Sequence, residues 1–239
     1  MADHVYAPGR RMLERGRADR GVVLLWHGRG VDSSSWMAPL AERVAARGAL
    51  ALAPDWSSET PDGGRSDLLT SLRYAREQAT AAGHDPDRIV VAGWSLGGTA
   101  ATSLAVHSKR LSVGLGGVVL IAPADGPGVL DGISGGPLPR TLPPGQGRCR
   151  IDVLYGQDDT STPPDQVGGL ELRLRAAGWT TSLHAVAADH GEIVGCRYDA
   201  RREIYRPSDE PRALAAADRV ADVIATAVSR PPTASPSAS

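Results

Sequence analysis

One serine stands between two glycines directly after an apolar run, a place where a hydroxyl neither packs a core nor sits in an ordinary loop. Residues 90–97 read VVAGWSLG and contain the spacing G-x-S-x-G. In such a turn the chain passes sharply from a strand into a helix and leaves the serine oxygen exposed. A side chain at either glycine would collide with the neighbouring strand or helix. The segment therefore predicts that Ser95 is displayed for nucleophilic chemistry.

A serine hydroxyl needs a base to take its proton, and the base needs a carboxylate to orient it. Residues 151–159 read IDVLYGQDD, a strand pattern that ends in G-x-x-D and is followed by Pro163. The next apolar run leads into Asp189-His190-Gly191. Both polar groups follow predicted strands, at the edge where ligands gather in an open parallel sheet. Their order along the chain is serine, acid, histidine.

Other acids and histidines compete for these roles. The spacing from Gly156 favours Asp159 over its neighbour Asp158. Asp189 is expected to form a turn, because adjacent side chains on a turn point apart. Among the six histidines, only His190 follows a late strand and precedes a helix. The histidines expected at surface or packing positions are His4, His84, His107 and His184.

A further motif follows the first predicted buried strand, where residues 26–30 read WHGRG. With the serine turn, the G-x-x-D acid and the histidine turn, it makes the chain resemble the α/β-hydrolase superfamily from Val22 to Val228. The length suits the compact branch of serine esterases and dienelactone-hydrolase-like proteins, with no large cap domain. Because Ser95 stands where dienelactone hydrolases usually have cysteine, their substrate is not implied.

The resemblance implies a role for each motif residue. Ser95 would be the nucleophile, His190 the general base and then acid, and Asp159 the orienting carboxylate. The backbone amides of Arg29 and Leu96 would form the oxyanion hole. His27 would brace the oxyanion loop through hydrogen bonds.

Substrate-binding residues are predicted with alternatives left open. The Arg29 side chain either reaches the substrate mouth, where it would favour an anionic or polar group, or stays exposed without substrate contact. Three tryptophans are candidates for an apolar pocket. Trp36 and Trp94 either line it or pack in the core, and Trp56 is a further candidate for its rim.

The implied function is a serine hydrolase that cleaves carboxylic esters or thioesters of small molecules through an acyl-enzyme. One alternative is an acyl-transfer or thioesterase tailoring enzyme, because an alcohol can replace water in attacking the acyl-enzyme. Another is a non-catalytic binding protein on a hydrolase scaffold, since a fold does not guarantee activity. We expect no cofactor and no metal, because no cluster of His, Cys, Asp or Glu has metal-ligand spacing.

Composition fits a small-molecule enzyme. The chain has 239 residues, and 26 basic against 27 acidic residues leave a formal charge of −1. No strong field therefore points to nucleic acid or a membrane surface. No apolar run approaches the roughly 20 residues of a membrane span, so we expect a cytoplasmic protein. We also expect a monomer or a homodimer. Cys149 and Cys196 are expected to be free thiols.

Continuous apolar runs alternate with helical patterns and predict an α/β fold, with a mostly parallel central sheet and helices on both faces. The predicted domain spans residues 22–229, after a lead-in over 1–21 and before a disordered tail over 230–239. A long loop near the site is expected over 123–147. Because no strand is evident before Val22, the sheet is expected to be trimmed. The predicted strands are 22–26, 49–53, 89–92, 118–121, 151–155 and 183–186.

Overall fold

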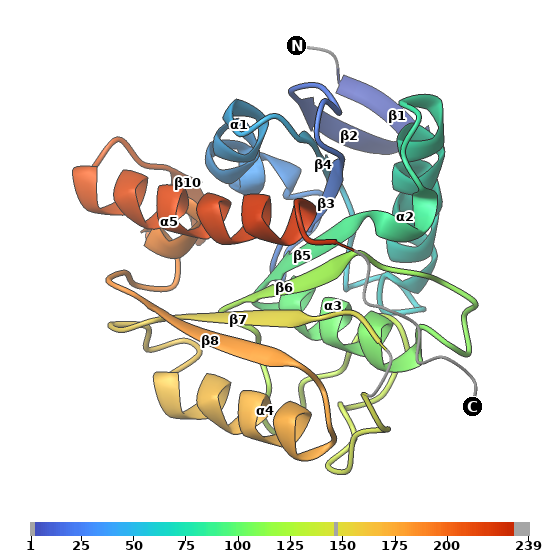
Figure 1. Ribbon diagram of the computed structural model, residues 1–239. Coiled ribbons are helices and arrows are strands. Elements are labelled where there is room, and N and C mark those ends of the chain that lie inside the picture. Colours follow the sequence, from blue (N-terminus) through green and yellow to red (C-terminus); the bar gives the residue numbers. More distant parts are fainter. Residues whose placement is uncertain (1–2, 146–147, 232–239) are drawn as a thin grey trace.

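The computed structural model describes residues 3–145 and 148–231 and contains an eight-stranded sheet between layers of helices (Figure 1). The strand order is β1-β2-β4-β3-β5-β6-β7-β8, and every pair from β4 to β8 is parallel. The predicted fold class is therefore confirmed. The strands are β1 (Asp3–Ala7), β2 (Arg10–Arg15), β3 (Val22–Trp26), β4 (Leu50–Pro54), β5 (Val90–Trp94), β6 (Gly117–Ile121), β7 (Ile151–Gly156) and β8 (Thr181–Val186).

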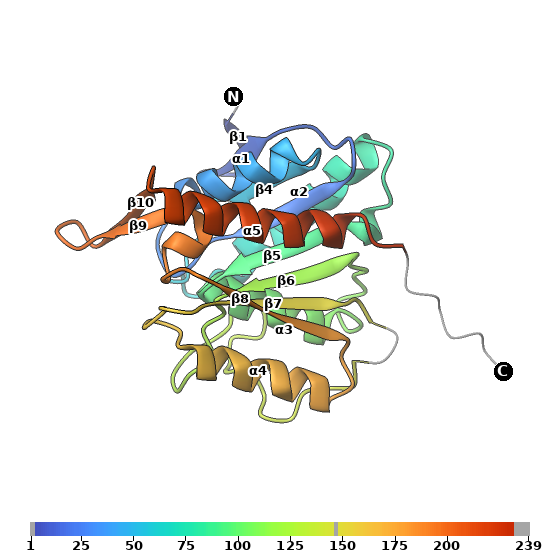
Figure 2. The same cartoon turned by 60° about the vertical axis from the view of Figure 1, so that its left-hand side comes forward.

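Helices cover both faces of the sheet because its central strands are apolar on both sides. Every residue of β3, β5 and β6 is buried, as expected for a parallel sheet between helices. One apolar core lies under α1 (Ala38–Ala46) and α5 (Pro211–Val228). The other lies under α2 (Arg65–Ala81), α3 (Leu96–His107) and α4 (Pro164–Ala176). Figure 2 shows α5 and α4 on opposite sides of the strands.

The expectation of a trimmed sheet is wrong, because β1 and β2 extend the sheet at its first edge. They pair antiparallel with each other, and β2 pairs antiparallel with β4. Only Met12 and Leu13 of β2 are buried. A strand that is half-exposed buries few side chains, so its apolar signal is weak compared with that of a central strand buried on both faces.

A two-stranded hairpin was also not predicted. Strands β9 (Cys196–Asp199) and β10 (Ile204–Pro207) pair antiparallel between the histidine turn and α5. Two backbone bonds close the base of the hairpin, Cys196 N to Gly191 O at 2.9 Å and Ser208 N to Gly195 O at 2.9 Å. In Figure 2 the hairpin projects from the molecule beyond the N-terminal end of α5. Short 3-10 turns are η1 (Ser34–Met37), η2 (Pro86–Arg88) and η3 (Glu192–Val194).

The predicted loop over 123–147 is attached to the fold along its length, and its residues 146–147 lie outside the described part of the chain. At its start, Ala124 N donates to Ser95 O at 3.1 Å. In its middle, Arg65 Nε donates to Ile133 O at 2.9 Å. Near its end, Gly145 N donates to Ala177 O at 2.9 Å. The described part of the loop therefore packs against α2, α3 and α4.

The chain beyond α5 begins with a buried ion pair. Arg230, which the predicted tail includes, donates to both carboxylate oxygens of Asp152, at 2.6 and 3.1 Å. Asp152 is 1% exposed, and His184 lies 3.3 Å from it. The end of α5 is thereby fastened to β7. Residues 232–239, the rest of the predicted tail, lie outside the described residues.

We predict that Arg230→Ala lowers the free energy of unfolding by about 1–3 kcal/mol, because it leaves the Asp152 carboxylate buried without its main partner. Urea denaturation at pH 7 measures this loss. The matched control is Arg175→Ala, because Arg175 pairs with Glu171 at 3.9 Å from an exposed position, where an ion pair contributes at most about 1 kcal/mol. Equal losses in both variants would contradict the anchoring role.

Candidate active site

Ser95 has a strained backbone that its surroundings hold in place. It lies between β5 and α3 with φ 54° and ψ −118°, a conformation that costs a non-glycine residue about 1–3 kcal/mol. Its N–H donates to Ile121 O at 2.9 Å. Its carbonyl oxygen accepts from Gly98 N at 2.9 Å, Thr99 N at 3.2 Å and Ala124 N at 3.1 Å. Both peptide groups of the turn are therefore bonded to the first turn of α3 and to the end of β6.

The flanking glycines are required by close backbone contacts. A Cβ atom on Gly93 would collide with the carbonyl of Gly97, and one on Gly97 would collide with the carbonyl oxygens of Trp26 and His27. A Cβ on Gly28 would lie 3.1 Å from the Cβ of Ser95. The G-x-S-x-G turn and the loop after β3 are thus in direct contact, which is the arrangement that an oxyanion hole beside a nucleophile needs.

The structure pairs the predicted acid and base. His190 Nδ1 lies 2.7 Å from Asp159 Oδ2, and both side chains are buried. Oδ1 of Asp159 accepts from the amides of Ser161 at 2.8 Å and Thr162 at 2.9 Å. Burial raises the pKa of Asp159, but the hydrogen bond and charge of His190 and the bonds from Thr162 outweigh it, so the pKa is lowered. Asp159 is therefore an ionised acceptor that fixes the proton of His190 on Nδ1.

His190 is connected to the turn of Ser95 through Trp94. Within the described residues no hydrogen bond joins the side chains of His190 and Ser95, as is common for catalytic pairs before substrate binds. Their neighbours nevertheless lie together. Trp94, which precedes Ser95, packs against the His190 ring with 5.1 Å between centroids and 37° between the ring planes, and it donates from Nε1 to His190 O at 2.9 Å.

The competing acids have other partners. Asp158 forms a surface ion pair with Arg212 of α5. Asp189 accepts from the amides of Gly191 and Glu192, each at 2.8 Å, and so forms the turn that presents His190. The geometry favours Asp159 over both as the partner of His190.

The loop after β3 is braced by His27, whose ring is fully buried. Because a carbonyl oxygen can only accept, Nδ1 carries the proton and donates to Gly28 O at 2.7 Å. Nε2 then accepts from Ser33 N at 3.3 Å. Burial lowers the pKa of His27 to about 4, against the opposing effects of the Gly28 bond and the Asp55 charge. His27 therefore stays neutral at physiological pH and holds the loop by hydrogen bonds.

The amides predicted for the oxyanion hole lie at two free positions. Leu96 is the first residue of α3, so its N–H has no carbonyl within the helix to donate to. The Arg29 amide has no backbone acceptor within residues 3–145 and 148–231. The Arg29 side chain is exposed.

The three predicted pocket tryptophans differ in exposure. Trp94 is 1% exposed and Trp56 is 0% exposed, whereas Trp36 is partly exposed. Trp56 stacks on His27 at 5.2 Å, and Trp94 packs at a tilt against His190. In this structure the two buried rings thus act on the site through the histidines, and only Trp36 retains a surface that a ligand can touch.

Sequence reasoning missed two residues that contact the pair. The hydroxyl of Thr162 donates to Asp159 Oδ2 at 2.8 Å and lies 3.3 Å from His190 Nδ1. Tyr205 of β10 packs with its ring centroid 6.2 Å from that of His190. A threonine three residues after a predicted acid is a readable signal, because its hydroxyl and amide can both reach the carboxylate. No local signal places Tyr205 at the site.

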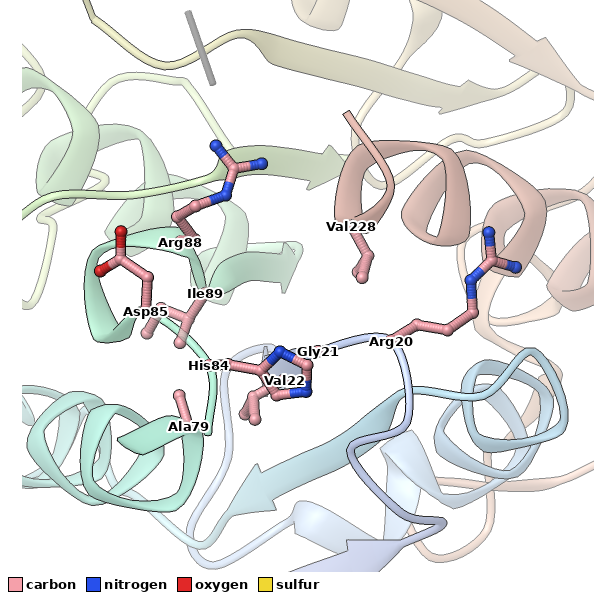
Figure 3. A pocket seen from close by; sticks show the side chains of 9 residues that line it. All are labelled: Arg20, Gly21, Val22, Ala79, His84, Asp85, Arg88, Ile89 and Val228. Atoms are coloured by element: carbon pink, nitrogen blue, oxygen red, sulfur yellow. The ribbon is translucent and has the colours of Figure 1, made fainter. Parts of the chain in front are cut away.

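A small cavity lies at the edge of the sheet opposite to Ser95 and His190, near the start of β3 and the end of α5 (Figure 3). Its volume of about 80 Å³ is below the roughly 300 Å³ of a typical small-molecule site. Arg20 and Arg88, at its rim, donate to Ser229 and to the Arg230 carbonyl. These contacts fasten the end of α5.

The described residues contain no group of three or more His, Cys, Asp or Glu side chains placed to hold a metal ion. Among the described helices, none is long and apolar enough to cross a membrane. Both cysteines are free, as predicted.

We predict that His27 makes the folded state acid-sensitive. Its pKa is about 4 when folded and 6.5 by its ordinary value, so between these values the unfolded chain binds more protons and stability falls as the pH falls. Each pKa unit is worth about 1.4 kcal/mol, so the full loss is about 3 kcal/mol. Urea denaturation from pH 7 to pH 4 should show a shallower pH dependence for His27→Asn than for wild type. The control His4→Asn, at an exposed position, should leave the slope unchanged; identical slopes for all three proteins would refute the assignment.

Comparison with solved structures supports the fold. A thermophilic esterase from the planctomycete Thermogutta terrifontis, with butyrate bound, superposes with a TM-score of 0.66 at 19% identity, covering 94% of this chain and 93% of its own. A thermostable esterase from Pseudomonas putida superposes with a TM-score of 0.63 at 16% identity, covering 92% of this chain and 79% of its own. MGS-M1, an alpha/beta hydrolase enzyme from a deep-sea metagenome library of the Medee basin, superposes with a TM-score of 0.63 at 20% identity, covering 92% of this chain and 97% of its own.

At these identities the structural likeness describes the fold alone. Among curated proteins, none is similar enough in sequence to count as a match. The model of the alpha/beta hydrolase family matches residues 22–236, which is most of the chain. The sequence match and the fold agree with the strained serine turn and the buried Asp159–His190 pair. The chain belongs to the alpha/beta hydrolase family.

Proposed function

We propose that the protein is a serine hydrolase that cleaves carboxylic esters or thioesters of small molecules. The observation that carries the proposal is the buried Asp159–His190 pair, which packs against the residue next to a serine held in a strained strand-to-helix turn. The similar solved structures include proteins described as esterases, which perform the same class of reaction.

In the proposed acylation step, Ser95 Oγ attacks the ester carbonyl while its proton passes to His190 Nε2. Nδ1 of His190 keeps its proton because it bonds to the ionised Asp159. The imidazolium that forms is stabilised by that carboxylate. His190 then gives the proton to the leaving alcohol or thiol, and the acyl group stays on Ser95.

The negative charge of the tetrahedral intermediate would be held by the amides of Leu96 and Arg29. Each such donor contributes about 3 kcal/mol to lowering the barrier, because it is oriented before the charge develops. The Leu96 amide belongs to the first turn of α3, whose positive end favours an anion. His27 supports the Arg29 amide indirectly, since it fixes Gly28 and Ser33 on either side.

Deacylation repeats these steps with water as the nucleophile and regenerates Ser95. With an alcohol in place of water the same site would transfer the acyl group. The partly exposed ring of Trp36 is proposed to border the substrate, with Trp56 and Trp94 behind it. A location in the cytoplasm and a monomeric or homodimeric state stay predictions.

We predict that a fluorophosphonate phosphonylates Ser95 with loss of fluoride and abolishes hydrolysis of p-nitrophenyl butyrate. Intact-mass spectrometry should find one adduct on wild type and none on Ser95→Ala. Turnover in that variant should fall by at least about 10⁴-fold. The exposed serine variant Ser35→Ala is the control and should be labelled like wild type.

Each other outcome points to an alternative. Folded wild type without an adduct or turnover would contradict the proposal and favour a binding protein on a hydrolase scaffold. Labelling of Ser95, together with formation of methyl butyrate in added methanol faster than formation of butyrate, would favour acyl transfer over hydrolysis.

We predict that the exposed Arg29 side chain favours anionic esters. Arg29→Ala should lower kcat/KM for p-nitrophenyl hydrogen glutarate by about 2- to 5-fold, which is the effect of an exposed charge pair. The value for neutral p-nitrophenyl butyrate should stay the same, because the backbone amide is retained. Arg29→Lys keeps the charge and serves as the control. An equal change for both esters would show that the Arg29 side chain does not distinguish anionic from neutral esters.

A further inference from the structure

The hairpin β9–β10 brings an aromatic side chain against the proposed catalytic base. The Tyr205 ring centroid lies 6.2 Å from that of His190 and 4.8 Å from that of Trp94. A Cβ on Gly191, the residue after His190, would lie 2.9 Å from the Tyr205 ring. Tyr205 is therefore packed against the turn that presents His190.

Tyr205 is also the centre of a row of rings. Its centroid lies 5.5 Å from that of Trp36 and 5.1 Å from that of Tyr198. The chain has 5 Trp, 5 Tyr and no Phe, so four of its ten large aromatic rings belong to this row. We call Trp36, Trp94, Tyr198 and Tyr205 the aromatic row.

Burial changes steadily along the aromatic row. Trp94 is 1% exposed, Trp36 and Tyr205 are partly exposed, and Tyr198 is 53% exposed. A single exposed tyrosine needs no explanation. A continuous set of rings that leads from solvent to a buried His–Asp pair is different, because it gives a ligand an apolar surface that ends at reactive groups.

The proposed chemistry says which part of a substrate would lie there. His190 must give its proton to the oxygen of the leaving alcohol, so that oxygen lies within hydrogen-bonding distance of Nε2. The alcohol group then extends along whatever flanks the imidazole. On the side of Trp94 and Tyr205, that flank is the aromatic row.

We propose that the aromatic row binds the alcohol part of the substrate and that the preferred substrates are esters of aromatic alcohols. The proposal rests on the serine hydrolase function proposed above. Aromatic rings attract one another most in edge-to-face and offset arrangements. The Tyr205 ring meets Trp36 at 67° and Trp94 at 86°, so the row already has this geometry. An aromatic ring of the substrate would continue it beside Tyr198.

The charge state of Tyr205 is compatible with this role. Burial, followed by the negative charges of Asp159 and Asp189, raises the pKa of Tyr205 to about 12. The ring therefore stays neutral over the working range of the enzyme and keeps its hydroxyl proton.

The test compares two acetate esters of equal ring size, benzyl acetate and cyclohexylmethyl acetate, by pH-stat titration of the acid released. Each kcat/KM is divided by the rate constant for hydroxide-catalysed hydrolysis of the same ester, which removes the difference in leaving group. The pairwise preference of aromatic rings corresponds to about a 2- to 12-fold ratio. We expect wild type to prefer the benzyl ester by about 5-fold.

Variants at Tyr198 separate ring stacking from bulk without touching the triad. Tyr198→Phe should keep the preference, whereas Tyr198→Leu and Tyr198→Ala should reduce it to about 1. Leu172→Ala is the matched control, because Leu172 is 55% exposed and lies on α4, which covers the other face of the sheet. It should behave as wild type. Thermal unfolding of each variant confirms that the comparison is made on folded protein.

Failure of this inference can be told apart from failure of the proposed function. If wild type is labelled at Ser95 and hydrolyses both esters with a ratio near 1, or if Tyr198→Ala keeps the wild-type ratio, the aromatic row does not bind the alcohol and the hydrolase function stands. If Ser95 is not labelled and neither ester is hydrolysed, the hydrolase function is wrong and the inference fails with it.

Discussion

The candidate site depends on one close contact between two backbone segments. Gly97, in the first turn of α3, lies against the carbonyl oxygens of Trp26 and His27 so closely that no side chain fits. This contact brings the turn after β5 against the loop after β3. The proposed nucleophile and one proposed oxyanion donor come from these two segments. A larger residue at Gly97 would push the two segments apart, even if the side chains of Ser95, His190 and Asp159 were unchanged.

The end of β6 connects the remaining parts. Ile121 O accepts from the Ser95 amide, and Ala122 O lies 3.2 Å from the Thr162 hydroxyl oxygen. Ala122 has φ 44°, a conformation that is uncommon for a residue with a Cβ. Two strained residues, Ser95 and Ala122, thus lie side by side at the carboxyl edge of the sheet. Backbone strain gathers where the surrounding structure over-determines the chain, and here the same contacts also join the serine turn to the loop that carries Asp159.

The sequence predicted the central strands well, for physical reasons. Strands such as β3 and β5 are buried on both faces, so their apolar runs are continuous. Ser95 and Asp159 follow the buried strands β5 and β7, whereas His190 follows β8, which is largely half-exposed. Strand β2, next to the edge of the sheet, and the hairpin β9–β10 were missed because half-exposed strands carry many charged residues. Thr162 and Tyr205 were missed because their contacts with His190 arise only in the folded chain. Spacing along the sequence favoured Asp159 over Asp158, and the folded geometry then pairs Asp159 with His190.

The base of the hairpin β9–β10 is held by backbone bonds, which leaves its tip free to vary. Two backbone bonds close the hairpin, at Gly191 and Gly195, outside the hairpin's tip. Both positions require glycine, because a Cβ would lie 2.9 Å from the Tyr205 ring at the first and 2.8 Å from Pro39 at the second. The tip can therefore lengthen, shorten or exchange residues while His190 and Asp159 keep their positions. Under the proposed function, hairpins with other residues at the position of Tyr198 would change substrate preference as a separable module and leave the proposed catalytic residues in place.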